Sequence, residues 1–115
     1  MRMWMVPPHL MCDKHLLGEH GELHKFLHNW RKKHAIDGRI SGNAMEPLAY
    51  KARHDVLAEE MQSRWMVHKS PIEQPDFSYL PLFQLNYKVD IQANKILLVS
   101  RCPQCAERIK YHDES

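Results

Sequence analysis

Several features that define other classes of protein are missing from this sequence. No apolar run approaches the roughly 18 residues that a transmembrane helix needs, so we expect no membrane span. Three cysteines are too few, and odd in number, for a disulfide scaffold, which favours a reducing, intracellular and cytoplasmic location. Pro7 and Pro8 interrupt the apolar N-terminus too early for a signal peptide.

Charge of neither sign is in excess. Sixteen Lys and Arg residues oppose 14 Asp and Glu residues, which gives a formal charge of +2 and excludes a histone-like polycation. The sequence has no internal repeat and no low-complexity segment. The 115 residues, 43% of them hydrophobic, therefore predict a single globular domain over 1–115.

Histidine is the residue in surplus, with nine copies in the chain. Four of them recur within one short stretch: His15, His20, His24 and His28. Because histidine titrates near neutral pH, the net charge would rise by up to nine units if all nine became protonated.

Hydrophobic periodicity predicts a compact all-α domain of three helices. We expect these helices over residues 12–34, 44–65 and 89–101. The arm that precedes them, 1–11, is apolar and extended, and we expect it to pack onto the domain. Before the last helix, 67–88 contain three prolines, which indicate a long irregular connection with a functional role.

The same period predicts the core side chains of each helix. On the first helix they are Leu16, Leu23, Leu27 and Trp30. On the second they are Leu48, Ala52, Val56, Leu57, Met61 and Trp65. On the third they are Ile91, Ile96, Leu97 and Val99. Asp13 and Asp90 are candidate N-caps, and Pro103 should end the third helix.

Polar side chains on the expected first helix form a candidate catalytic stripe. His15, Glu19 and Glu22 are three and four residues apart, so they would share one helix face. A histidine and two carboxylates so arranged can perform acid–base catalysis, although an ordinary solvated face has the same spacing. If both carboxylates are partly buried, their mutual repulsion should raise the pKa of one of them.

A second ladder on this helix comprises His20, His24 and His28, whose four-residue spacing can chelate a metal. In the zinc-binding HExxH helix a glutamate follows the first histidine, whereas Gly21 occupies that position here. We therefore interpret the ladder as a polar face whose charge changes with pH, in preference to a metal site.

The three cysteines form a candidate metal site. Cys102 and Cys105 have the CxxC spacing of half a zinc site, and Cys12 is a candidate third ligand. Candidates for the fourth ligand are His9, His15 and His112. A bare dithiol is an equal alternative, and a redox role is less favoured because the sequence has no βαβ pattern.

Residues 14–23, KHLLGEHGEL, resemble the first helix of the pyrimidine-dimer DNA glycosylase family, the endonuclease V type of phages. That helix carries a histidine, a glutamate and the catalytic glutamate at the spacings of His15, Glu19 and Glu22. In the arm, Met1 falls at the family's N-terminal nucleophile and Arg2 at its N-terminal arginine. The resemblance covers most of the chain, but identities are dense only in residues 1–34.

Other segments resemble the family less closely. Residues 53–64 are similar to its second helix, and Arg101, Pro103 and Tyr111 are similar to the C-terminal segment that touches the lesion. Gly21 and Lys25 stand where the phage enzyme has arginines. These departures weaken the expectation of dimer specificity more than the expectation of lyase chemistry.

The resemblance implies a DNA repair glycosylase with AP lyase activity, which acts on damaged or modified pyrimidines. A Schiff base at C1′ of the sugar needs an uncharged amine. An α-amine with a pKa of about 7.7–8 supplies far more of that form at neutral pH than a lysine with a pKa of about 10.4. Met1 would supply the amine and Glu22 the acid–base group. This chemistry requires no cofactor, so any zinc would be structural.

The expected partner is double-stranded DNA, bound by a monomer without a membrane. The resemblance implies substrate or DNA contacts for Arg2, His15, Glu19, Lys25, Arg31, Lys32, Arg101 and Tyr111. Further cations that would neutralise phosphates are Lys33, Arg53 and Arg108.

Two other functions fit parts of the sequence. Gly21 and the cysteine-bearing tail favour a zinc-stabilised helical DNA-binding module without catalysis. A weaker alternative is a metal-dependent hydrolase that uses His20, His24 and the carboxylates. The base that a glycosylase would remove is not encoded in any motif of this sequence.

Overall fold

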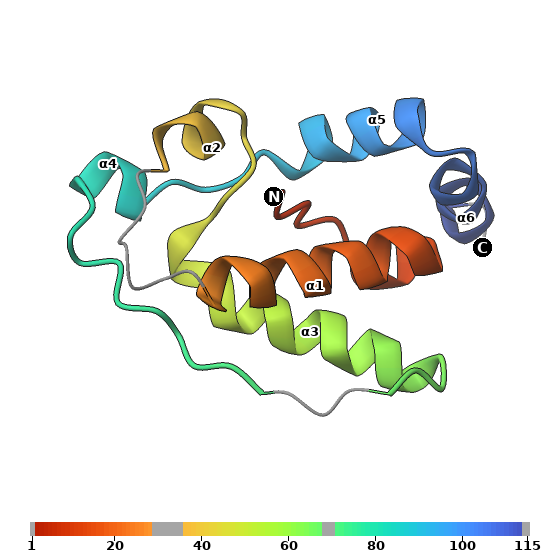
Figure 1. Cartoon of the computed structure of the whole chain (residues 1–115). Helices are drawn as coiled ribbons and strands as arrows, with labels where there is room; N and C mark the ends of the chain where they lie inside the picture. The colour runs from red at the N-terminus through yellow and green to blue at the C-terminus, as the bar shows by residue number, and fades with distance from the viewer. Residues whose placement is uncertain (1, 29–35, 68–70, 114–115) are drawn as a thin grey trace.

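A computed structural model describes residues 2–28, 36–67 and 71–113 of the chain (Figure 1). Within these ranges the secondary structure is entirely helical, so the predicted all-α class is confirmed. Three helices correspond to the expected ones: α1 (Asp13–His28), α3 (Tyr50–Ser63) and α5 (Ile91–Arg101). The part of the first expected helix that includes Trp30 lies outside the described residues.

The predicted number of three helices is wrong, because the described ranges contain six α-helices. Two are short: α2 (Asp37–Ser41) and α4 (Leu82–Leu85). The third addition is α6 (Pro103–Asp113). Two 3-10 turns, η1 (Pro8–Leu10) and η3 (Pro47–Ala49), complete the described secondary structure.

The C-terminal segment after α5 forms a helix of its own, α6, of which Pro103 is the first residue. As predicted, α5 ends before this proline, and Cys102 follows in an extended conformation with φ −131° and ψ 108°. Proline is favoured in the first turn of a helix, since its missing N–H would have no intrahelical acceptor there. Cys102 is therefore the corner between α5 and α6 (Figure 1).

The core lies where α1 and α3 pack side by side, with α5 and α6 closing it (Figure 1). Leu16 and Leu23 of α1 are fully buried, which confirms part of the predicted stripe. Leu57 of α3 and Leu98 of α5 are also fully buried. No helix in the described ranges is both long and apolar enough to cross a membrane.

The N-terminal arm packs onto the domain, as its hydrophobicity predicts. Met3 and Val6 are completely buried, and the Met3 amide donates to the Ala44 carbonyl at 2.7 Å. Asn94 of α5 donates from Nδ2 to the Trp4 carbonyl at 3.1 Å, and Arg53 of α3 donates from Nη1 to the Val6 carbonyl at 2.8 Å. The arm is thus held from two sides.

The predicted core stripe of the second helix is partly wrong. Leu48, Ala52 and Val56 are exposed, and Trp65 is 95% exposed. The face that α3 buries instead includes Arg53 and His54. Hydrophobic periodicity cannot find such a face, because two of its buried residues are polar and satisfied by partners elsewhere in the chain.

The stripe predicted for the third helix is mostly wrong for a similar reason, and only its Leu97 packs against the core. Ile91, Ile96 and Val99 are exposed, whereas Asn94 and Leu98 are buried. The connection before this helix is irregular, as expected, apart from α4. Its buried side chains, Ile72, Phe77 and Leu80, join the core.

Candidate active site and neighbouring clusters

Five of the predicted site residues meet at one cleft of about 430 Å³. It lies where the arm, α1 and the end of α5 come together. The lining residues are Arg2, Trp4, Lys14, His15, Gly18, Glu19, Glu22 and Arg101. Lys14 and Trp4 were not predicted as site residues, although Lys14 directly precedes His15 of the predicted catalytic stripe.

Arg2 and Glu22 are in contact at this cleft. The backbone amide of Arg2 donates to Oε2 of Glu22 at 3.2 Å. The arginine side chain turns towards α5, where Nη1 donates to Oδ1 of Asn94 at 2.9 Å and to the Gly42 carbonyl at 3.0 Å. Its guanidinium carbon also lies 5.3 Å from the centre of the Trp4 ring, within cation–π range. The candidate nucleophile Met1 lies outside the described residues.

Glu19 is in a different environment from Glu22, although both border the cleft. Its side chain is fully buried and accepts hydrogen bonds from Nε and Nη2 of Arg53 at 2.6 and 2.8 Å. Burial raises the pKa of Glu19, and the hydrogen bonds and charge of Arg53 oppose that rise. Arg53 is only 4% exposed, which corrects its inclusion among the cations that would neutralise phosphates.

His15 lies between the cleft and the cysteine cluster and contacts both. Its ring lies edge-on to Trp4, with 5.9 Å between ring centres, and its Nδ1 is 3.3 Å from Sγ of Cys12. Burial, together with the nearby charge of Lys14, lowers the pKa of His15. A neutral imidazole in this position can accept a hydrogen bond or bind a cation.

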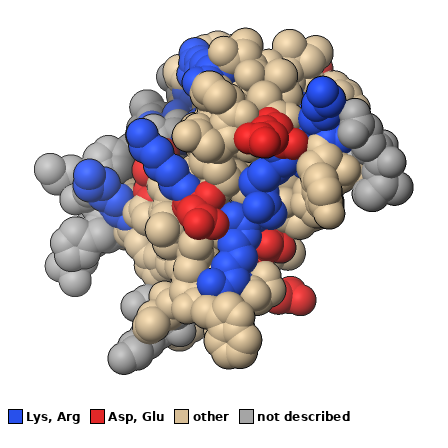
Figure 2. Space-filling model, turned by 90° about the vertical axis from the view of Figure 1, so that its right-hand side faces the viewer, with Lys and Arg blue, Asp and Glu red and all other residues tan. Residues whose placement is uncertain are grey.

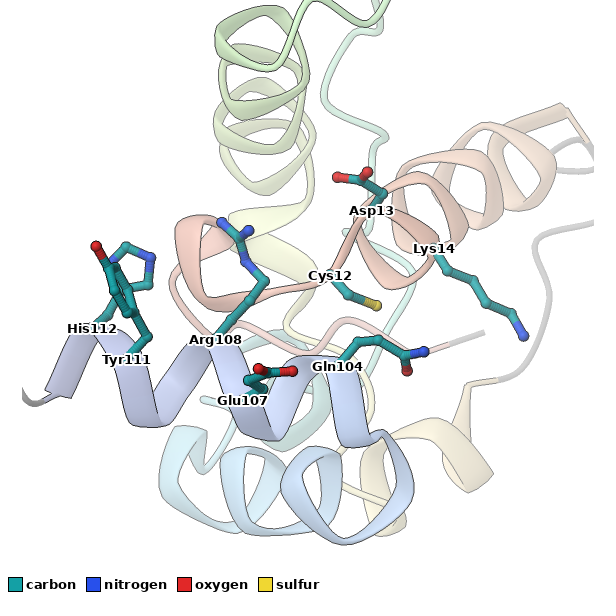
Figure 3. A pocket seen from close by; sticks show the side chains of 8 residues that line it. All are labelled: Cys12, Asp13, Lys14, Gln104, Glu107, Arg108, Tyr111 and His112. Carbon is teal, nitrogen blue, oxygen red and sulfur yellow. The ribbon is translucent and has the colours of Figure 1, made fainter.

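The remaining candidates do not line the cleft. Tyr111 and Arg108 line a second pocket of about 640 Å³ between α6 and the start of α1 (Figure 3). Arg108 donates from Nε and Nη2 to the carbonyl of His9 at 3.2 and 2.7 Å, which fixes it to the arm. Lys25 is exposed on α1 and lines neither pocket, and Arg31, Lys32 and Lys33 lie outside the described residues.

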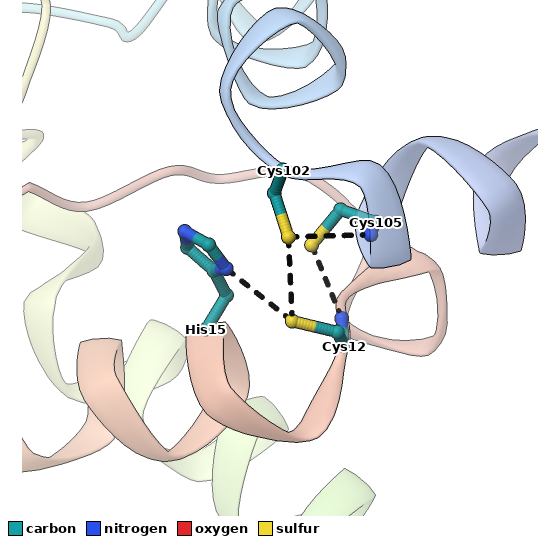
Figure 4. Close-up of side chains that lie close together, drawn as sticks. All are labelled: Cys12, His15, Cys102 and Cys105. Carbon is teal, nitrogen blue, oxygen red and sulfur yellow. Dashed lines mark hydrogen bonds between the residues drawn. The ribbon is translucent and has the colours of Figure 1, made fainter.

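The three cysteines converge with His15 (Figure 4). All four ligand atoms lie within 4.8 Å of one another, and the three thiols are free and buried. Burial raises the pKa of Cys105 to about 12. Burial acts in the same direction on Cys102, but hydrogen bonds from the Cys105 amide and thiol lower its pKa overall.

A second convergence joins α1 to α3, and the sequence interpretation missed it. One ring nitrogen from each of His20, His24 and His54 lies within 4.8 Å of the other two. The sequence ladder gave two of the three histidines, but His54 is 30 positions further along the chain than His24 and no local spacing connects them. The side chain of His28, the third histidine of the predicted ladder, lies outside the described part of the chain.

Comparison with known proteins gives one match to a family. A family model described as pyrimidine dimer DNA glycosylase matches residues 1–74. The chain belongs to the pyrimidine dimer DNA glycosylase family. No curated protein and no solved structure matches the chain.

The pyrimidine dimer DNA glycosylase match covers the arm, α1 and α3, and with them Arg2, His15 and Glu22. It ends before α5 and α6, which contribute Arg101, Cys102 and Cys105. The substrate class implied by the family is DNA. The cleft is therefore built by the matched part of the chain and completed by a segment outside the match.

Proposed function

We propose that this protein is a DNA glycosylase with AP lyase activity, which attacks damaged or modified pyrimidine nucleotides in double-stranded DNA with the amine of Met1. The contact between the Arg2 amide and Glu22 is the observation that carries the proposal. Arg2 is bonded directly to Met1, so the candidate acid–base carboxylate lies one residue from the candidate nucleophile.

The proposed reaction needs an uncharged amine and one carboxyl group. The amine lone pair forms a bond to C1′, the N-glycosidic bond breaks, and its electron pair leaves with the base. The attached amine loses one proton, the C1′–O4′ bond breaks with its electron pair going to O4′, which Glu22 protonates, and a protonated imine forms at C1′. Glu22 then removes a proton from C2′, and the 3′ phosphate leaves by β-elimination.

The other residues of the cleft have supporting roles in this proposal. Lys14 and Arg101 are exposed at the cleft and would bind DNA phosphates. The guanidinium of Arg2 is already bound to Gly42 and Asn94, which favours a role in fixing the arm. Glu19 is committed to Arg53, so we assign it a structural role instead of a DNA contact.

Borohydride trapping tests the proposed chemistry. Incubating the native protein with abasic duplex DNA and borohydride should yield a covalent adduct, because reduction converts the imine into a stable amine. Extension of the N-terminus by a few residues should remove the adduct, because the α-amine is no longer at the sugar. An undiminished adduct would rule out Met1 as the nucleophile.

Substitution of Glu22 tests the acid–base role. Glu22→Gln should leave DNA binding intact and reduce strand cleavage by roughly 100-fold or more. Glu59→Gln, on an exposed position of α3, is the matched control and should cleave normally. Full cleavage by Glu22→Gln would refute the assignment.

The cysteine cluster favours one alternative, a zinc-stabilised helical module that binds DNA without catalysis. It predicts retention of duplex DNA with neither an adduct nor nicking. A panel of duplexes that carry a pyrimidine dimer, an abasic site, an oxidised pyrimidine or a modified pyrimidine separates the two functions. The same panel identifies the lesion, which the geometry of the cleft does not specify.

A further inference from the structure

Four metal-ligand side chains from distant parts of the chain meet beside the cleft (Figure 4). Cys12 precedes α1, His15 lies in its first turn, and Cys102 and Cys105 lie at the α5–α6 corner. Three thiols and one imidazole are a ligand set of closed, structural zinc sites. We propose that Cys12, His15, Cys102 and Cys105 bind one zinc ion through three sulfurs and Nδ1 of the histidine.

The distances between the ligand atoms agree with tetrahedral zinc. Bonds of about 2.3 Å to sulfur and about 2.05 Å to nitrogen place two sulfurs about 3.8 Å apart and a sulfur and a nitrogen about 3.6 Å apart. The Cys12 and Cys102 sulfurs are 3.7 Å apart, and Cys12 Sγ is 3.3 Å from His15 Nδ1. A disulfide would need its sulfurs about 2.05 Å apart.

Backbone amides surround the sulfurs as they do in thiolate sites. The amide of Cys12 donates to Sγ of Cys105 at 3.2 Å, and the amide of Cys105 donates to Sγ of Cys102 at 3.4 Å. Such hydrogen bonds stabilise negative charge on a sulfur and orient it towards a cation.

The proposed zinc would fasten the segment outside the family match to the matched part. Cys12 and His15 belong to residues 1–74, whereas Cys102 and Cys105 follow Cys12 by 90 and 93 positions. Arg101 borders the cleft and is the direct neighbour of Cys102. The ion would therefore hold this cation at the cleft, and it would withdraw His15 from acid–base chemistry.

Cobalt substitution tests the ligand set. The full chain, purified without a polyhistidine tag and stripped of metal, should develop thiolate-to-cobalt charge-transfer absorption that saturates at one equivalent of Co²⁺. Cys102→Ser should weaken this absorption and shift it. His15→Asn should alter the visible bands, whereas the matched control His112→Asn should leave them unchanged.

Native protein provides a measurement that does not depend on variants. An organomercurial reagent that modifies the three thiols should release one equivalent of Zn²⁺, detected with a chromogenic chelator. Less than about a tenth of an equivalent released, together with no charge-transfer absorption on cobalt titration, would overturn the proposal. Neither measurement uses DNA, so failure here is independent of the proposed glycosylase function.

A different observation supports a second site, between α1 and α3. Nε2 of His24 lies 3.3 Å from Nε2 of His20 and 2.9 Å from Nε2 of His54. Metal–nitrogen bonds of about 2.05 Å give nitrogen separations of about 2.9 Å at right angles and about 3.3 Å at tetrahedral angles. We infer that these three histidines bind a first-row divalent metal ion, for which Zn²⁺ is the probe.

His54 is prepared for such binding by its neighbour. It is 1% exposed, and its Nδ1 lies 3.0 Å from Oδ1 of Asp55. A carboxylate at this distance favours a proton on Nδ1, which places the lone pair of the ring on Nε2, the nitrogen that faces His24. The third histidine comes from α3, so this inference differs from the sequence interpretation of His20 and His24 as a pH-dependent polar face.

Zinc stoichiometry separates the second site from the first. The native chain should bind two equivalents of Zn²⁺, and His54→Gln should bind one while keeping the thiolate-to-cobalt absorption. The control His112→Gln should still bind two. In native protein, Zn²⁺ should also protect His20 and His24, which are partly exposed, from diethylpyrocarbonate, as measured by peptide mass spectrometry. Binding limited to the cysteine site, without such protection, would refute the inference.

Discussion

Glu19 belongs to the predicted catalytic stripe but lies in a buried ion pair. It has the spacing of the recognised stripe and borders the cleft, yet both of its oxygens accept hydrogen bonds from Arg53. Arg53 in turn donates to the carbonyl of Val6, so the ion pair connects α1, α3 and the arm. The pair fixes the position of the arm from which Arg2 reaches Glu22.

Arg53→Met should be strongly destabilising. It would leave the Glu19 carboxylate buried without a counter-charge, which costs about 3–5 kcal/mol. Urea unfolding followed by circular dichroism measures the loss. Lys51→Met is the control, because the Lys51–Asp55 pair is about half exposed and worth about 0.5 kcal/mol or less. Equal losses in the two variants would contradict this interpretation of Glu19.

Asn94 is a positioning residue for the arm. Its Oδ1 accepts from Arg2, and its Nδ2 donates to the carbonyls of Trp4 and Asn43. Asn94→Ala should lower the yield of the borohydride adduct by about tenfold, because the chain start would no longer be held at Glu22. Gln92→Ala, exposed on the same helix, should give the normal yield. Rescue of the Asn94→Ala adduct by saturating DNA would instead indicate a defect in binding.

At the scale of elements, α5 begins where the sequence indicated. The carboxylate of Asp90 accepts from the Ala93 amide at 3.1 Å, which is the predicted N-cap. Asp13 does not act as the N-cap of α1. It is the first residue of that helix, and its carboxylate pairs with Arg64 at 2.9 Å. Local capping rules therefore located the starts of both α5 and α1. At α1, however, the Asp13 carboxylate binds a tertiary partner, Arg64, instead of capping the helix.

Asp90→Ala should destabilise the protein by about 0.5–2 kcal/mol, because an amide in the first turn of α5 loses its acceptor. Asp90→Asn retains a side-chain oxygen that can cap the helix, so it should change the free energy of unfolding much less than Asp90→Ala does. Thermal denaturation of the two variants provides the comparison. A larger loss for Asp90→Asn would show that charge, and not capping, is what this position contributes.

At the scale of the whole molecule, the near-neutral charge is visible on the surface. On the face seen in Figure 2, Lys and Arg side chains lie interspersed with Asp and Glu side chains. On this face, binding to DNA would therefore depend on individual cations instead of a continuous basic patch. Lys14 and Arg101 are the exposed cations that line the cleft.

This distribution predicts the salt dependence of DNA binding. Lys14→Ala and Arg101→Ala should each weaken binding, and each should reduce the slope of log K against log salt by about 0.9. Fluorescence anisotropy with a labelled duplex over a range of salt concentrations measures both quantities. Lys51→Ala, on α3 outside the cleft, should leave the slope unchanged. An unchanged slope for Arg101→Ala would remove this residue from the DNA interface.

The structure brings part of the predicted site residues together at the cleft, for reasons that differ among the residues. His15, Glu19 and Glu22 follow helical spacing within α1, so the sequence could bring them together without tertiary information. Arg101 joins them only because the end of α5 returns to the start of α1. His54 could not be linked to His20 and His24, because their contact depends on the packing of α1 against α3.

The sequence by itself determined the all-α class, the three principal helices, the packing of the arm and the family, because these depend on local periodicity, capping and the motif in residues 1–34. Tertiary structure decided which polar groups are buried and which meet: Glu19 and Arg53 form an ion pair, His15 joins the predicted cysteines, and His54 joins His20 and His24. The physical reason is that a buried charge or imidazole loses its hydration and needs a polar partner to offset that cost. The partners of Glu19 and His54, which are Arg53 and His24, lie on another helix, so local sequence does not identify them.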